Sequence, residues 1–234
     1  MKLTFCAFLL LIPTLLTVGA APADAKKAGA KKADSKKDWT AIFNGKDTKG
    51  WEMTGPGQLK LVNKELVTEG GMGMLWYSAK KYGNCKIRVV FKLTSSNDNS
   101  GIFIRLPERP SDPMQAVNQG YEVQIDNTGD EYHRTGCLYS LTKAKKAVNA
   151  KVNKWNKMVI TLDGKRTIVK LDGETITDFT EGDPVPPKKS DYEPVRGPRP
   201  ETGYIGLQNH GGDAKVHFKE VSISPLAKKP KAKK

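Results

Sequence analysis

Short runs in which apolar and polar residues alternate recur along the chain between residues 85 and 226. Successive side chains of a β-strand point to opposite faces, so this period of two predicts strands with one buried face. Two Asp-Gly pairs inside the later runs are the turn sequence most typical of β-hairpins. The alternating runs occupy residues 85–93, 100–106, 121–126, 137–141, 155–179, 202–211 and 215–226.

Helical patterns are weak along the whole sequence. No segment of eleven or more residues repeats its apolar positions with a period of 3.6, and residues 113–119 predict at most one helical turn. Many short, closely spaced strands therefore predict an all-β fold, an antiparallel β-sandwich of the jelly-roll kind. The loops 107–120 and 180–203 are long, and loops of this length are usually functional or disordered. The second, rich in proline, is either a stiff rim segment or lid, or a disordered insertion.

The two ends of the chain differ from its body. A basic start, a short apolar run and small residues are typical of a cleaved secretory signal peptide, which we assign to residues 1–25. A membrane anchor is the rival, but the run is short and contains Pro13. We therefore expect an exported protein, periplasmic or extracellular, without a membrane span. The remaining chain is expected to form a disordered Lys/Ala linker at 26–38, one domain at 39–226 and a basic tail at 227–234.

Most of the formal charge of +14 comes from eleven lysines in these two ends. The lysines are not interleaved with aromatic residues and no nucleic-acid-binding motif accompanies them, so we expect no nucleic-acid partner. The tails are expected to lie in solvent or to contact anionic polymers of the cell envelope.

The cysteines and the glycine-rich segment form no recognisable metal or nucleotide motif. Removal of the signal peptide leaves Cys85 and Cys137, which form either a disulfide or two buried thiols. The sequence lacks CxxC and HExxH, and the glycines at 70–74 have the wrong spacing for a nucleotide site. We therefore predict no cofactor and no metal site, although the carboxylates and imidazole discussed next leave a divalent ion such as calcium open.

Three predicted strands each carry polar residues on one face. In the strand at 121–126 these are Glu122, Gln124 and Asp126, and in the strand at 202–211 they are Gln208 and His210. A solvated sheet face produces such alternation without any function. Glutamine, histidine, arginine and aspartate are poor choices for a plain wet face, however, which favours a functional trough. The third strand offers Asn99 and Arg105, and Tyr139 and Trp76 are expected to add aromatic surface.

The order of several motifs resembles the 3-keto-disaccharide hydrolase family. The resemblance covers about residues 39–226 and is most specific in Asn-Ser-Gly before a strand with arginine, Tyr-Glu-x-Gln-Ile-Asp, and Gly-Leu-Gln-x-His-Gly. It implies a concanavalin A/laminarinase-like jelly roll. It also implies cleavage of glycosides whose sugar has been oxidised to a ketone at carbon 3, with an oxidised carbohydrate as the partner.

Such a ketone makes the proton at carbon 2 acidic, so a base can remove it and the group at carbon 1 can leave. Face-sharing and the resemblance together give hypotheses for the roles. Glu122 or His210 is the base, the other or Asp126 is the acid, and Arg105 stabilises the enolate oxygen. The residues expected to bind substrate are Gln124, Gln208, Tyr139, Asn99 and Trp76.

Two alternatives stay open. A conventional glycosidase needs two carboxylates about 5 to 10 Å apart, whereas Glu122 and Asp126 lie roughly 13 Å apart along one strand. A non-catalytic carbohydrate-binding module would use the same trough with the same amides and aromatic rings. Release of the aglycone from a 3-keto-glucoside distinguishes the enzyme from the module.

Overall fold

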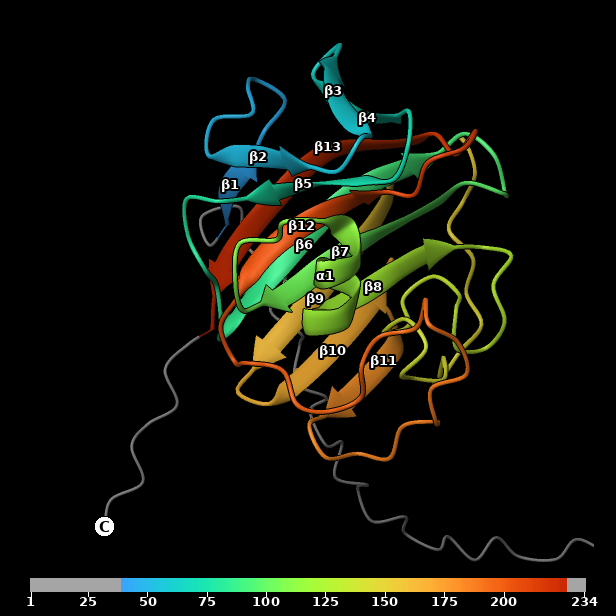
Figure 1. Cartoon of the computed structure of the whole chain (residues 1–234). Coiled ribbons are helices and arrows are strands. Elements are labelled where there is room, and N and C mark those ends of the chain that lie inside the picture. Colours follow the sequence, from blue (N-terminus) through green and yellow to red (C-terminus); the bar gives the residue numbers. More distant parts are fainter. Residues whose placement is uncertain (1–38, 227–234) are drawn as a thin grey trace, which may run out of the picture. The chain divides into compact units, whose positions relative to one another are not determined.

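The computed structural model describes residues 39–226, and these form a sandwich of two antiparallel sheets with one short helix (Figure 1). The predicted all-β fold is confirmed. One sheet has the order β11-β10-β9-β6-β13-β4-β3, with β1 also paired to β13. Its strands are β1 (Thr40–Phe43), β3 (Gln58–Val62), β4 (Glu65–Glu69), β6 (Cys85–Leu93), β9 (Asn156–Asp163), β10 (Arg166–Leu171), β11 (Glu174–Thr180) and β13 (Val216–Pro225).

The second sheet has the order β2-β5-β12-β7-β8 and carries the polar strands that the sequence singled out. Its strands are β2 (Trp51–Thr54), β5 (Gly73–Tyr77), β12 (Tyr204–Asn209), β7 (Asn99–Leu106) and β8 (Tyr121–Asp126). We call it the five-stranded sheet, and its side turned away from the other sheet the outer face.

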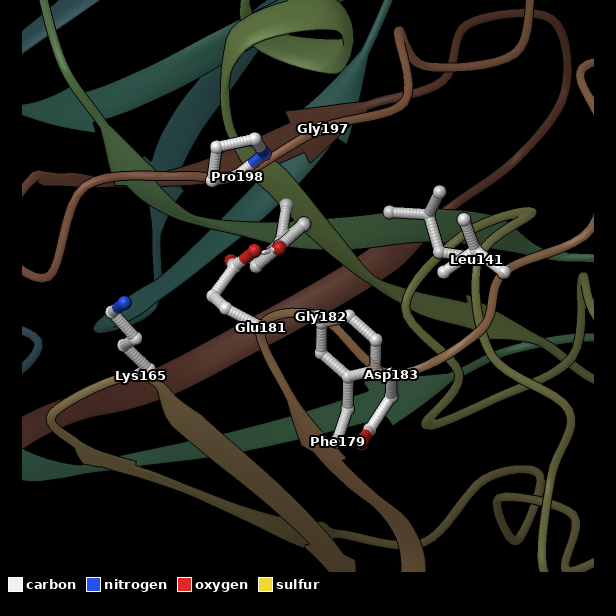
Figure 2. Close-up of a pocket in the computed structure, with 10 residues that line it drawn as sticks. Leu141, Lys165, Phe179, Glu181, Gly182, Asp183, Gly197 and Pro198 are labelled. Carbon is white, nitrogen blue, oxygen red and sulfur yellow. Dashed lines mark hydrogen bonds between the residues drawn. The ribbon is translucent and has the colours of Figure 1, made fainter.

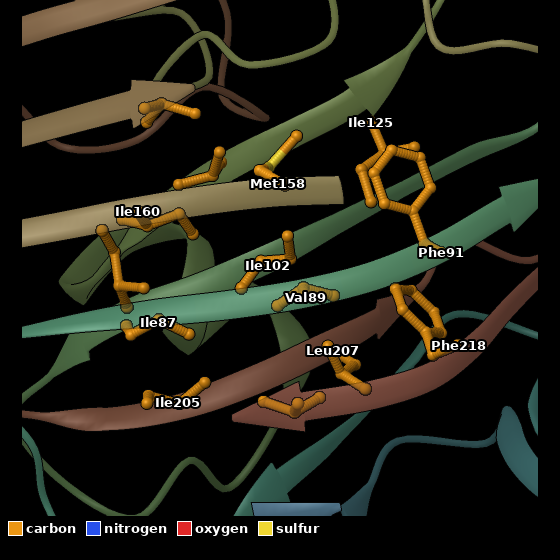
Figure 3. Packing of buried hydrophobic residues seen from close by; sticks show 14 of the residues in the cluster. Ile87, Val89, Phe91, Ile102, Ile125, Met158, Ile160, Ile205, Leu207 and Phe218 are labelled. Atoms are coloured by element: carbon orange, nitrogen blue, oxygen red, sulfur yellow. The ribbon is translucent and has the colours of Figure 1, made fainter. Parts of the chain in front are cut away.

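The main core lies between the two sheets and follows from the alternation. In β6 every second residue is buried, and Ile87, Val89 and Phe91 have no exposed surface. They pack with Ile102 of β7 and Ile125 of β8, which come from the facing sheet (Figure 3). Burying one such side chain contributes about 1.5–3 kcal/mol, so this layer contributes most of the hydrophobic stabilisation of the folded state.

Local turn chemistry fits the predicted hairpins. Leu171 pairs with Glu174, so Asp172 and Gly173 form the two-residue turn, with φ angles of 48° and 96°. Positive φ at both positions is the type I′ geometry that suits the twist of a hairpin. The other predicted hairpin joins β9 to β10 through Gly164, directly after Asp163.

The predicted helical turn is α1 (Pro113–Gln119), which lies over β7 and β8 on the outer face (Figure 1). Asp112 caps it by accepting a hydrogen bond from the Gln115 backbone, and Pro113 begins it, as is typical of helix starts. Ala116 and Val117 pack on a second apolar cluster that includes Trp76 and Phe103. Among residues 39–226, α1 is too short to be a membrane-spanning helix, and no other helix has the length and hydrophobicity of one.

The Pro-rich loop 180–203 is a rim segment held by two arginines, not a disordered insertion. Arg196 donates to the carbonyl oxygens of Pro186, Pro187, Pro194 and Ser140 at 2.7–3.1 Å. Arg199 is also bound by backbone carbonyls, those of Gly120, Asn118, Val195 and Gly197, at 2.6–2.9 Å.

The cysteines are two buried thiols. Cys85 and Cys137 are free, with 3% and 0% of their surfaces exposed, so the disulfide alternative is wrong for this pair. Burial raises the pKa of each thiol to about 11, which keeps both protonated and unreactive. The signal peptide, the linker and the basic tail lie outside the described residues.

Arg105 does not share the outer face, and the expectation that it lines the trough is wrong. Between Phe103 and Leu106 the register of β7 against β12 shifts, and Arg105 takes a left-handed backbone conformation with φ of 57°. A bulge of this kind adds one residue and reverses the facing of the next side chain. Phe103 and Leu106 therefore both contact the outer cluster, while Arg105 turns inward and is 1% exposed.

The guanidinium of Arg105 holds β7 to the β9–β10 hairpin and to the rim segment. It donates to the carbonyl oxygens of Pro200 at 3.0 Å, Gly164 at 2.7 Å and Arg166 at 3.3 Å, and to the Thr167 hydroxyl at 3.4 Å. Its permanent charge thus stabilises the fold and has no route to a substrate on the outer face.

We predict that Arg105→Ala lowers the free energy of unfolding by about 3 kcal/mol or more, because several buried carbonyl groups lose their donor. Urea denaturation followed by circular dichroism measures the change. Arg109→Ala is the control, since Arg109 is 66% exposed and should cost under about 0.5 kcal/mol. Equal losses in the two variants would show that the inward hydrogen bonds of Arg105 are unimportant.

Candidate functional site

Strand register brings one line of residues together across the outer face. Trp76 of β5 is opposite Gly206 of β12, Gly206 is opposite Phe103 of β7, and Phe103 is opposite Glu122 of β8. The line continues beyond the last strand, because the Tyr139 backbone N–H donates to the Glu122 carbonyl at 2.9 Å. Glu122 and Tyr139 therefore lie opposite each other, with the Glu122 carboxyl near enough to act on the Tyr139 hydroxyl electrostatically.

A second line contains the glutamines. Gln208 of β12 is opposite Met74, and Gln124 of β8 is opposite Gly101 of β7. The Glu122 carboxyl leans from the first line into the second and lies over Gly101, where it accepts a hydrogen bond from Gln208. We call Gly101, Glu122, Gln124 and Gln208 the polar patch. The sequence correctly placed these residues on one face.

Gly101 is required by this packing. A β-carbon at this position would lie 2.2 Å from Glu122 Oε1 and 2.6 Å from its Cγ. Even alanine would therefore push the carboxyl out of its place, because such distances are far below van der Waals contact.

The Glu122 carboxyl is buried and holds its proton strongly. Only 5% of the residue is exposed, and this burial raises the pKa of the carboxyl to about 8, whereas the hydrogen bond from Gln208 acts in the opposite direction. Desolvation disfavours the charged form of an acid, which is the larger effect here. A carboxyl with a pKa near 8 is a stronger base, once ionised, than an ordinary glutamate.

Asp126 and Asn99 are engaged with their neighbours. Asp126 Oδ1 accepts from the backbone and hydroxyl of Thr128, both at 2.7 Å, and from the Gly129 backbone at 3.2 Å. Its Oδ2 accepts from Asn99 Nδ2 at 3.3 Å. These bonds close the turn after β8, so Asp126 serves the local structure and is poorly placed for the acid role expected from the sequence.

His210 lies apart from the polar patch, just beyond the end of β12. It is exposed and lines a hollow of about 440 Å³ together with Asn99 and residues of the loops at 94–98 and 211–214. Asn99 also accepts a hydrogen bond from Gln124, at 3.3 Å. The hollow therefore adjoins the polar patch through Asn99, and His210 lies on the exposed border of the hollow.

The two predicted aromatic residues differ in access. Trp76 is 2% exposed beneath the α1 cluster, and its indole N–H donates to the Thr54 hydroxyl at 3.1 Å, so it offers no open stacking surface. Tyr139 is half-buried beside Glu122. Burial raises the pKa of its hydroxyl, and the nearby Glu122 charge acts in the same direction.

The sequence missed a histidine next to Tyr139. The ring of His133 packs edge-on against that of Tyr139 with 5.0 Å between centroids, and its Nδ1 lies 2.7 Å from Asp130 Oδ1. Both residues belong to the turn-rich stretch after β8, which has no alternation to draw attention to it. The sequence signal for this pair is the spacing Asp-x-x-His, which one arginine separates from Thr-Gly-Cys-Leu-Tyr.

A second hollow, of about 370 Å³, is lined by a different set of residues (Figure 2). Phe179, Leu141 and Pro198 form apolar parts of its wall, and Lys165 and Glu181 border it. The Tyr121 hydroxyl donates to Glu181 there. None of the residues predicted for the site lines this hollow. Across residues 39–226, no three His, Cys, Asp or Glu side chains are grouped so that they could hold a metal ion.

Similar folds occur in several solved proteins. A candidate glycosyl hydrolase from Parabacteroides distasonis ATCC 8503 is 23% identical, with a TM-score of 0.66 over 82% of this chain and 95% of its own. A galectin-like protein of unknown function from Bacillus subtilis is 11% identical, with a TM-score of 0.53 over 80% of this chain and 94% of its own. The lumenal domain of VIP36 is 13% identical, with a TM-score of 0.55 over 84% and 91%. At these identities the likeness shows the fold.

The sequence itself gives the family. No curated protein sequence matches the chain. The model of the 3-keto-alpha-glucoside-1,2-lyase-like domain matches residues 38–224, which is most of the chain and includes every residue of the polar patch. The resemblance seen in the motifs is confirmed and supports a carbohydrate-related function: the chain belongs to the family of 3-keto-alpha-glucoside-1,2-lyase-like domains.

Proposed function

We propose that this domain is an exported enzyme that cleaves glycosides carrying a ketone at carbon 3, by elimination followed by addition of water. The observation that carries the proposal is the buried Glu122 carboxyl, beside Gln208 on the outer face, with a pKa of about 8. Family membership supports the proposed substrate class, and the polar patch contains a base of suitable strength.

Glu122 is assigned the proton abstraction. The carbon 3 ketone acidifies the hydrogen at carbon 2, and the ionised carboxylate takes it as a proton. The electron pair left at carbon 2 forms a double bond to carbon 1, and the bond from carbon 1 to the leaving oxygen breaks. Water then adds across the new double bond, with its hydroxyl at carbon 1 and a proton at carbon 2. A base works best when its pKa lies near the operating pH.

Tyr139 replaces Arg105 as the proposed partner of the enolate oxygen. Its raised pKa means that the phenol keeps its proton and can donate a hydrogen bond to a developing negative charge. His210, at the border of the adjoining hollow, is proposed to give the leaving oxygen its proton. Water and leaving group would pass through this hollow, because it adjoins the polar patch through Asn99.

A carbohydrate-binding module is the second candidate. The lumenal domain of VIP36, which is similar in fold, is described in a Ca²⁺- and Man3GlcNAc-bound form. A module would use the amides of the polar patch and would have no need of a carboxyl held at a raised pKa. That feature favours the enzyme.

We predict that Glu122→Gln lowers kcat on a chromogenic 3-keto-glucoside by about 100- to 10,000-fold, because the base is lost. In the wild-type protein kcat/KM should rise with pH through an apparent pKa of about 8, because only the ionised carboxylate accepts the proton. Release of the chromophore measures both. Glu108→Gln, at an exposed position, is the matched control. Undiminished release by the Glu122 variant would refute the assignment, and binding without release by wild type would favour the module.

The same carboxyl predicts a pH dependence of stability. Its pKa in the folded state lies above the ordinary value of 4.5, so between pH 4.5 and 8 the unfolded chain has lost this proton while the folded protein keeps it. The Glu122 contribution therefore falls as the pH rises through this window, by on the order of 4 kcal/mol.

Glu122→Gln removes this contribution, so its stability relative to wild type should increase steadily from pH 4 to pH 9. Urea denaturation at several pH values measures the difference, and Glu108→Gln should stay parallel to wild type. Parallel curves for both variants would mean that Glu122 titrates as an ordinary glutamate.

A further inference from the structure

The orientation of the Gln124 amide is fixed by a chain of hydrogen bonds that begins at a carboxylate. Asp126 Oδ2 can only accept, so Asn99 presents its Nδ2 to it, at 3.3 Å. Asn99 Oδ1 then faces Gln124 and accepts from its Nε2, also at 3.3 Å. The Gln124 amide nitrogen is therefore bonded to Asn99, and the amide oxygen is the atom left for another donor.

A second chain gives the same result for Gln208. When Glu122 is ionised, as the proposed base must be, its carboxylate accepts the hydrogen bond that Gln208 donates, so the amide nitrogen is used there and the oxygen points elsewhere. In both chains a carboxylate at one end leaves an acceptor oxygen at the other end.

Both amide oxygens are buried without a partner. Gln124 and Gln208 are 3% and 5% exposed, and Oε1 of each has no hydrogen-bond partner within residues 39–226. Leaving a buried acceptor unsatisfied costs about 1–3 kcal/mol. Native proteins rarely leave such groups without a reason, and two on one sheet face, on either side of the base, point to a ligand that supplies the donors.

The two oxygens belong to strands on opposite sides of β7. Gln124 is on β8 and Gln208 is on β12, and the Glu122 carboxyl lies over Gly101 between them. Two interstrand spacings separate their backbones by roughly 10 Å, and the side chains can converge from there on a single sugar ring.

We infer that Gln124 and Gln208 are specificity residues that each accept a hydrogen bond from a different hydroxyl group of one bound sugar. Asp126 is a positioning residue, which acts through Asn99 to keep the Gln124 oxygen turned toward the ligand. The inference rests on the proposed function for the class of ligand, a glycoside. A sugar that lacks either hydroxyl, or carries it as a methyl ether, brings no donor and leaves the acceptor unsatisfied.

Binding of unoxidised methyl α-glucoside tests this without any chemistry, because that compound has no ketone to acidify carbon 2. Calorimetry at a pH above the pKa of Glu122, with the monodeoxy and mono-O-methyl derivatives of this glucoside, should find two positions at which either change weakens binding by about tenfold or more. Gln124→Leu should abolish the discrimination at one of these positions and Gln208→Leu at the other. Asp126→Asn should reduce only the discrimination that depends on Gln124. Gln119→Leu, at the exposed end of α1, should change nothing.

The outcomes separate this inference from the proposed function. Equal binding of all derivatives, no binding of methyl α-glucoside, or unchanged discrimination in both leucine variants would overturn it. Leucine variants that unfold are replaced by Gln124→Met and Gln208→Met, with the same expected result. Discrimination without release from a 3-keto-glucoside would leave the inference standing and refute the enzyme. Release from a 3-keto-glucoside without discrimination among the derivatives would overturn the inference and leave the proposed enzyme function standing.

Discussion

The central strands of the five-stranded sheet are covered on both sides, and this constraint governs the site. β7 and β8 are buried along almost their whole length, by the main core on one side and by α1, its apolar cluster and neighbouring loops on the other. Polar groups on these strands have little water to bind, so each needs a protein partner or carries an energetic cost. Ser100, for example, donates to the Gln208 carbonyl at 2.7 Å.

The same constraint explains the properties of the polar patch. Covering Glu122 raises the pKa of its carboxyl, and covering the two glutamines leaves their oxygens without water. An open antiparallel sheet with the same sequence pattern would have had ordinary solvated glutamate and glutamine side chains. The chemistry proposed for the site therefore depends on coverage of the sheet as much as on residue identity.

Alternation in the sequence was enough to predict the strands from β6 onward, the two hairpins and the shared face of Glu122, Gln124 and Gln208. It did not predict β1 to β5, and the run 137–141, expected to be a strand, forms turns with a single bridge at Leu138. The alternation predicted the wrong face for Arg105, because one bulge residue reverses the facing of every later position in the strand. The sequence does not show where the bulge lies. The alternation also did not predict that Trp76 is buried, because the residues that cover its ring come from α1, which is distant in the sequence. The Asp130–His133 pair was not predicted, because residues in turns show no periodic pattern of apolar and polar positions.

Loss of Arg105 from the face changes the electrostatic character of the proposed reaction. The remaining groups beside Glu122 are a phenol and amides, which stabilise a developing charge through hydrogen bonds and not through a full positive charge. A conventional pair of catalytic carboxylates is also disfavoured, because both oxygens of Asp126 are used within its own turn and by Asn99.

The packing of the Glu122 carboxyl over Gly101 links two positions that are far apart in the chain. Because a β-carbon would occupy the space of the carboxyl, a larger residue at 101 is compatible only with a shorter one at 122. Among homologous sequences the two sites should therefore covary, with glycine retained wherever the long acid is kept. A homologue without that glycine is expected to keep the β-sandwich fold but to lack the buried glutamate base.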